Sequence, residues 1–178
     1  MNSLLVLLTC AQMACAPEEK EMKATTLSQE EVIDELVQND VLSHCCSLFH
    51  EVLDHFESGE SIDFSIKADG SLVSSLELEV EKNVGKYLAK ITPWAGFQGE
   101  EGVCFGSQMH HSSFKWYLDP IDGTISFKNG IDTFAFVLTL VDGDEAIATV
   151  IEFPKLVKRY KAYKKRGAFV NGEPIRVK

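Results

Sequence analysis

Apolar residues recur at three- and four-residue spacing in two stretches of the chain, which is the period of an amphipathic helix. Ser28 is a candidate N-cap for the first stretch, and Gly59 ends it. Asn39-Asp40 interrupts the pattern, so we expect a break there. The second helix is expected over about residues 75–90, before Pro93. The defining positions are Val32, Ile33, Leu36, Val37, Cys45, Leu48, Phe49, Val52, Leu53 and Phe56, then Leu76, Val80, Val84, Tyr87 and Leu88.

Apolar and β-branched segments between turn signals predict strands over much of the remaining chain. Asp142-Gly143-Asp144 is a hairpin signal between two of them. Helices followed by hairpin-connected strands predict an α+β fold, with two long helices packed on a mainly antiparallel sheet. The expected strands cover residues 62–66, 94–97, 116–118, 133–141, 146–153, 157–163 and 168–177, the last as a short pair around Asn171-Gly172.

The charge of the chain bears on its partners. Its 178 residues carry a formal net charge of −10, which disfavours nucleic acid because phosphate binding needs clustered Lys and Arg. The basic cluster at residues 155–166 alternates with apolar residues and predicts a strand with a solvated face; a nucleic-acid patch is the weaker alternative. Five cysteines, without metal-site spacing, indicate reduced thiols and a cytoplasmic protein.

The N-terminal segment leaves an alternative open. Residues 1–15 contain the apolar run Leu4-Leu5-Val6-Leu7-Leu8, which resembles a short signal sequence but has no Lys or Arg before it. An N-terminal helix or a packed apolar start is favoured; export or lipid anchoring is the alternative. The run is too short to span a bilayer, so no membrane span is expected. Residues 16–28 are polar and are interpreted as a linker leading into the main domain, residues 29–178.

Carboxylates gather where predicted strands end: at Glu100-Glu101, Asp119 and Asp122. Hard cations such as Mg²⁺ prefer several carboxylate and carbonyl oxygens. Two aspartates across a Pro-Ile turn can aim both carboxylates at one point, with the Ile121 carbonyl between them. The alternative is that Asp-Pro-Ile-Asp-Gly is an ordinary turn and Glu100-Glu101 a solvated loop.

A candidate anion site follows directly in the sequence. Gly123 permits a tight turn, and the residues from Thr124 are expected to open a short helix whose free N–H groups attract anions. A metal site beside an anion site is the arrangement that phosphate chemistry needs.

Four segments together resemble the inositol monophosphatase family, a family of Mg²⁺-dependent, lithium-sensitive phosphomonoesterases. They are K-A-D-G-S-L-V-S at 67–74, G-E-E at 99–101, W-Y-L-D-P-I-D-G-T at 116–124 and G-A-F-V-N-G-E-P-I at 167–175. The resemblance covers about residues 30–178. It implies a small phosphate monoester as substrate and the first half of the layered α-β-α-β-α sugar-phosphatase fold. A 3'(2'),5'-bisphosphate nucleotidase or a sugar-bisphosphate phosphatase is the alternative within the family.

The resemblance also implies ligands for Mg²⁺, of which two or three ions are expected. Carried over to matching positions, Glu100, Asp119 and the Ile121 carbonyl hold the first ion. Asp119 bridges to a second ion, which Asp122 also binds.

Catalytic and phosphate-binding roles follow in the same way. Glu100 and Thr124 would orient the attacking water, and Gly123 and Thr124 would offer backbone N–H groups to the phosphate. Where the family has Thr-x-Ala-Asp, this chain has Ser74-Ser75-Leu76-Glu77. Glu77 therefore takes the place of an aspartate that hydrogen-bonds the threonine; the alternative is an ordinary solvated helix residue.

The family's second domain carries a W-D motif that completes the second metal site, and nothing in this sequence matches that motif. We therefore expect the C-terminal domain to be absent and the second site to be incomplete. The alternative function is a catalytically weak or inactive metal- or phosphate-binding half-domain. Its uncovered sheet face would favour self-association or a partner chain.

Overall fold

The computed structural model describes residues 27–68, 70–105 and 112–176. The interpretations of residues 1–15 and of Asp69 in the first family motif lie outside these ranges.

Three longer helices form the layer on one side of the molecule. The predicted break is confirmed: α1 (Gln29–Gln38) and α2 (Val41–Glu57) are separated at Asp40, whose φ of 44° is left-handed. The second predicted helix is α3 (Ser75–Ile91). Both α1 and α3 begin with a capping box, in which a serine and a glutamate three residues later bond each other's backbone N–H groups.

The main sheet has eight strands, ordered β10-β9-β8-β7-β6-β5-β3-β4. All neighbours are antiparallel except β3 and β5, which confirms the α+β fold class with a mainly antiparallel sheet. A separate ribbon joins β1 (Phe64–Ile66) to β2 (Leu72–Ser74). The other strands are β3 (Gly96–Gly99), β4 (Cys104–Phe105), β5 (Phe114–Asp122), β6 (Ala135–Asp142), β7 (Glu145–Phe153), β8 (Lys158–Tyr163), β9 (Gly167–Val170) and β10 (Glu173–Ile175).

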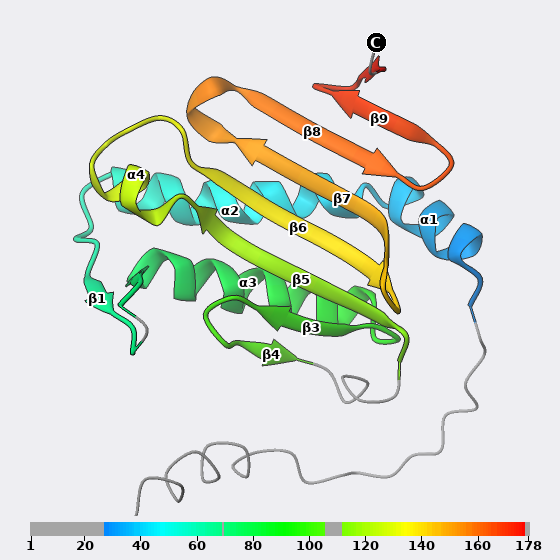
Figure 1. The fold of residues 1–178 in the computed structure, drawn as a ribbon, viewed down its shortest axis with the longest axis horizontal. Helices are drawn as coiled ribbons and strands as arrows, with labels where there is room; N and C mark the ends of the chain where they lie inside the picture. Colours follow the sequence, from blue (N-terminus) through cyan, green and yellow to red (C-terminus); the bar gives the residue numbers. More distant parts are fainter. Residues whose placement is uncertain (1–26, 69, 106–111, 177–178) are drawn as a thin grey trace, which may run out of the picture.

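One face of the sheet packs on the helices and forms the core (Figure 1). Helix α2 lies against β6 and β7, where Phe49 stacks on Phe136 with ring centroids 5.1 Å apart. Helix α3 lies against β3 and β5. The fully buried Trp116 donates its indole N–H to Thr92 Oγ1 over 3.0 Å, which satisfies its polar atom inside the core.

The opposite face of the sheet is crossed by no helix among the described residues (Figure 1). Cross-strand pairing places Tyr117, Thr139 and Thr149 in one row on this face. A second row joins Val137 and Ile151 with Tyr160. We call this surface the open face; it is largely apolar, and Tyr117 is 41% exposed.

The bounds of two predicted strands differ from those observed in a way that bears on the acidic residues. The strand expected at 94–97 lies two residues later, because a turn closed by Ala95 N–H to Thr92 O occupies its start. The strand expected to stop at Leu118 continues to Asp122, with a pairing irregularity between Asp119 and Asp122. The turn therefore begins at Gly123, and both aspartates belong to the strand.

The basic cluster forms β8, as predicted, but its face is not only solvated. Arg159 bonds to Glu152, and Lys161 Nζ lies 2.9 Å from Asp40 Oδ1. These ion pairs connect β8 with β7 and with the α1–α2 junction. None of the helices in residues 27–68, 70–105 and 112–176 has the length and apolar content needed to cross a membrane.

Candidate active site

The parallel pair β3–β5 brings the predicted acidic residues to one edge of the sheet. Gly99 pairs with Leu118, so Glu100 and Asp119 follow neighbouring positions on adjacent strands. The Glu100 N–H donates to the Leu118 carbonyl over 2.9 Å and fixes this arrangement. The Glu100 side chain is 52% exposed and can move toward a ligand.

The carboxyl of Asp119 lies in a repulsive environment. Burial is the main cause that raises its pKa to about 7, and the charge of Glu100 and then that of Asp122 add to the effect. The Ile121 N–H donates to Asp119 Oδ1 over 3.0 Å and works in the opposite direction. The negative charges of Glu100, after β3, and of Asp122, on β5, therefore disfavour the ionised form of Asp119.

Gly123 forms the turn after these residues. Its φ of 95° favours glycine, and a Cβ there would lie 3.3 Å from the Thr133 carbonyl oxygen. The predicted short helix follows as α4 (Thr124–Lys128). Gly123 thus directs the chain from β5 into α4 and places Thr124 at its start.

Glu77 is not a solvated helix residue: it is 1% exposed. Its Oε2 accepts from the Ser74 N–H and hydroxyl, each over 2.6 Å, at the start of α3. Its Oε1 accepts from Thr124 Oγ1 over 2.8 Å. The longer side chain reaches Thr124 without leaving the helix cap, so the alternative interpretation as a solvated residue is wrong.

Glu81 and Lys67 also belong to this region, and the sequence interpretation missed both. Glu81, fully buried, accepts from the backbone N–H groups of Glu101 over 2.6 Å and Val103 over 3.1 Å. Lys67 Nζ lies 2.7 Å from Glu101 Oε1 and 3.9 Å from Glu100 Oε1. A signal existed for Glu81, because it lies among the apolar positions of α3, where an acid needs a partner.

The loop that carries Glu100 and Glu101 packs closely on Glu81 of α3. An added Cβ at Gly99 would lie 2.2 Å from the Glu81 carboxyl carbon. Burial is the main cause that raises the pKa of Glu81 to about 6, although its two backbone hydrogen bonds lower it. Gly99 therefore leaves the space in which Glu81 orders the loop that carries Glu100.

The donor set fits a hard cation. Carboxylates and the Ile121 carbonyl are oxygen ligands of the kind Mg²⁺ prefers. Within the described ranges, no three His, Cys, Asp or Glu side chains already stand close enough together to hold an ion. Glu100 and Asp122 are exposed and would have to turn toward Asp119. The chemistry of the residues thus fits the ion, with side-chain rotation as the requirement.

The site thus sets oxygen ligands suited to a hard cation beside a strand-to-helix turn. The chain matches the model of the inositol monophosphatase family over residues 30–178, and it belongs to that family.

Comparisons with individual relatives agree with this family assignment. The chain is 34% identical over 112 residues to a fructose-1,6-bisphosphatase/inositol-1-monophosphatase of Aquifex aeolicus, covering 63% of this chain and 41% of that protein. It is 32% identical over 126 residues to a histidinol-phosphatase of Chlorobaculum parvum, covering 70% and 47%. The chain spans less than half the length of these relatives. The structure of the extragenic suppressor protein suhB from Bartonella henselae aligns with a TM-score of 0.70 at 26% identity, covering 79% of this chain and 54% of that one.

The double role of Glu77 can be tested against a matched residue. Glu77→Ala removes the cap of α3 and the partner of Thr124, and we expect it to lower the free energy of unfolding by about 2–3 kcal/mol. Glu31→Ala removes the same capping box from α1, where the glutamate is exposed, and should cost clearly less. Urea unfolding measures both; equal losses would show that the Thr124 contact contributes nothing.

The raised pKa of Asp119 predicts a pH-dependent stability in EDTA. The pKa is about 7 in the folded chain and near 4 when unfolded, so the folded state binds an extra proton in this window. Stability should therefore fall as pH rises from about 4 to 7. Asp119→Asn removes this loss and can donate to Glu100, so its melting temperature should exceed that of wild type at pH 8.

At pH 4.5 the advantage of Asp119→Asn should largely disappear. Asp144→Asn, at an exposed position in the β6–β7 hairpin at the opposite end of β6 from Asp122, is the control and should show no such pH-dependent gain. A variant that melts below wild type at pH 8 would contradict the electrostatic account.

Proposed function

We propose that this chain is a Mg²⁺-dependent phosphatase domain that hydrolyses a small phosphate monoester. The observation that carries the proposal is the placement of Glu100, after β3, beside Asp119 and Asp122, which end β5 directly before the Gly123–Thr124 turn. Uncompensated carboxylates that repel one another are costly unless a cation joins them. Membership of the family supports the same chemistry.

The acidic residues would hold the ions. Glu100, Asp119 and the Ile121 carbonyl are the proposed ligands of one Mg²⁺, and Asp119 with Asp122 are those of a second. Bound Mg²⁺ would neutralise phosphoryl charge and lower the pKa of a water. Lys67, 3.9 Å from Glu100, offsets part of the negative charge of the metal-free site.

Thr124 and Glu77 are the proposed pair that orients the attacking water. The Thr124 hydroxyl donates its proton to Glu77 Oε1, so its lone pairs stay available to accept a hydrogen bond from water. Glu100 would accept a second water proton. The backbone N–H groups of Gly123 and Thr124 are the proposed contacts of the substrate phosphate.

The names of the relatives suggest substrates to test. Matches include inositol-1-monophosphatases, histidinol-phosphatases and a fructose-1,6-bisphosphatase/inositol-1-monophosphatase. We propose an inositol monophosphate-type monoester first, with nucleotide 3'(2'),5'-bisphosphates and sugar bisphosphates as alternatives. Lithium sensitivity is proposed by analogy with a lithium-soaked inhibitory complex of a staphylococcal inositol monophosphatase.

A second candidate is a half-domain that binds metal or phosphate without turnover. One observation favours it: the described residues hold no preformed three-ligand metal site. The two functions differ in turnover rather than in ligand binding.

Phosphate release decides between them. We expect Mg²⁺-dependent release from inositol 1-phosphate, histidinol phosphate, fructose 1,6-bisphosphate or adenosine 3',5'-bisphosphate, measured colorimetrically. Asp119→Asn should lower the rate at least about 100-fold, because it removes a ligand and its charge. Asp144→Asn, in the β6–β7 hairpin, is the control and should retain activity. If calorimetry shows that Mg²⁺ binds but no phosphate is released from any of the four substrates, the proposed phosphatase function is contradicted. That result would support the half-domain that binds metal or phosphate without turnover.

We further propose that the open face associates with a second copy of the chain, since contiguous exposed apolar surface favours association. Ile151→Lys places a charge in the middle of this face and should shift a dimer to a monomer in sedimentation velocity. Leu156→Lys, at an exposed position outside the sheet, should leave the dimer intact. A monomeric wild-type chain at micromolar concentration would contradict this proposal.

A cytoplasmic location is proposed as well, consistent with the free thiols of the adjacent, buried Cys45 and Cys46. Recovery of the chain in a secreted or membrane fraction on cell fractionation would contradict it.

A further inference from the structure

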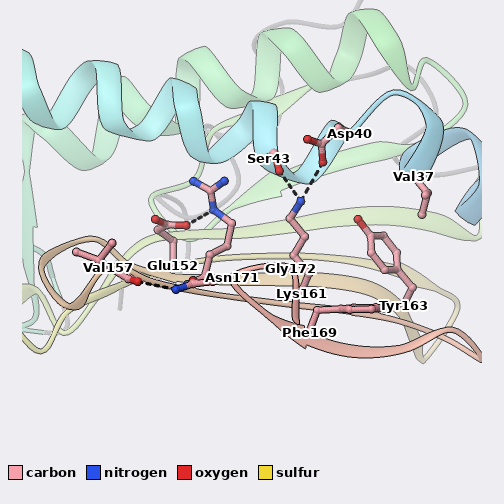
Figure 2. Close-up of a pocket in the computed structure, with 11 residues that line it drawn as sticks. Val37, Asp40, Ser43, Glu152, Val157, Lys161, Tyr163, Phe169, Asn171 and Gly172 are labelled. Atoms are coloured by element: carbon pink, nitrogen blue, oxygen red, sulfur yellow. Dashed lines mark hydrogen bonds and ion pairs between the residues drawn. The ribbon is translucent and has the colours of Figure 1, made fainter. Parts of the chain in front are cut away.

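A cavity lies on the helix side of the sheet, between the α1–α2 junction and strands β8 and β9 (Figure 2). Its volume is about 600 Å³, within the range of small-molecule sites. Successive strand residues point to opposite faces, so Arg159 and Lys161 face this cavity while Tyr160 lies on the open face, the side of the sheet to which Asp119 belongs. The cavity is therefore separate from the candidate active site.

The acidic groups in the cavity already have partners. Glu152, which is 5% exposed, bonds to Arg159 Nε, and His50 Nε2 lies 3.0 Å from its other oxygen. Asp40 Oδ1 accepts from Lys161 Nζ over 2.9 Å, and Lys161 also bonds to the Ser43 hydroxyl (Figure 2). These contacts leave little acceptor capacity unused.

The groups in the cavity that can still form hydrogen bonds are donors. Among the described residues, no partner is found for the terminal nitrogens of Arg159, the third proton of Lys161 or the hydroxyl of Tyr163. Burial raises the pKa of Tyr163 to about 12, so its hydroxyl keeps its proton near neutral pH. Three donors from three side chains of β8 thus line one cavity.

Part of the cavity wall is apolar. Val37 of α1, Val157 and Phe169, which pairs with Lys161 across β8 and β9, line this part. An occupant would therefore place an anionic group at the donors and an apolar body against these side chains. A phosphoryl group between Arg159 and Lys161 would bring up to two negative charges to two cationic side chains, which a carboxylate cannot do, while Tyr163, two residues farther along β8, would contact another part of the same molecule.

We propose that this cavity binds a small phosphorylated molecule with an apolar or aromatic body, held by Arg159, Lys161 and Tyr163. Asp40 competes with the ligand for Lys161. Its carboxylate side chain is 66% exposed, so it can turn into solvent when the ligand arrives. The strength of binding is therefore set by an ion pair that the ligand must replace.

The test uses phenylphosphonate, which phosphatases cannot hydrolyse, titrated into the full chain in EDTA and followed by calorimetry. Without metal ions, the acids around Asp119 repel the probe, so binding reports on the cavity. We expect saturable binding of one equivalent, and weaker binding of benzoate. Lys161→Met should weaken it about tenfold or more, and Tyr163→Phe a few-fold.

Asp40→Asn should change the affinity for phenylphosphonate in the opposite direction. Asparagine tolerates the left-handed backbone at this position and no longer holds Lys161 as an ion pair, so binding should tighten a few-fold. Lys158→Met removes the same charge from β8 but on the open face, and Asp119→Asn alters the other site. Both controls should bind like wild type.

Any of these results would overturn the proposal: no saturable binding to wild type, unchanged binding to Lys161→Met, equal weakening by Lys158→Met, or weaker binding to Asp40→Asn. Circular dichroism of each variant establishes that it is folded. Changed binding in Asp119→Asn would place the probe at the candidate active site and would also overturn the proposal.

Discussion

The buried carboxylate of Glu77 connects the helical layer to the candidate active site. An ionisable group that is 1% exposed is tolerated only when its oxygens are hydrogen-bonded. Here one oxygen satisfies the start of α3 and the other accepts the Thr124 hydroxyl. The position of the turn after β5 therefore depends on where α3 begins. The same side chain, Glu77, therefore caps α3 and fixes the position of Thr124 in the site.

The sheet separates two kinds of surface. Asp119 lies at one end of the open face, beside the exposed Glu100 and Asp122. The helix side carries the ion pairs of β8 and a cavity rich in unused donors. Acceptor-rich and donor-rich regions thus occupy opposite sides of one layer. The first suits cations and the second suits anions, which follows from the alternation of side chains along β5 and β8.

The periodicity of the chain was sufficient to predict the helices, the break at Asp40 and the α+β class, because these depend on local spacing. The extent of β5 could not be predicted, because Pro120 and Gly123 suggest an early turn whereas pairing with β6 continues to Asp122. Glu81 was missed for a different reason. Its partners are backbone N–H groups twenty residues away, and no local pattern encodes that contact.

The contact between Gly99 and Glu81 makes two distant positions interdependent. The space above the glycine is filled by a carboxylate that orders two N–H groups of the next loop. A side chain at position 99 could be accommodated only if position 81 became smaller, and a smaller residue there would leave both N–H groups without their acceptor. Either substitution alone would disturb the loop that carries Glu100. We therefore expect substitutions at positions 99 and 81 to occur together in related sequences, and to be rare.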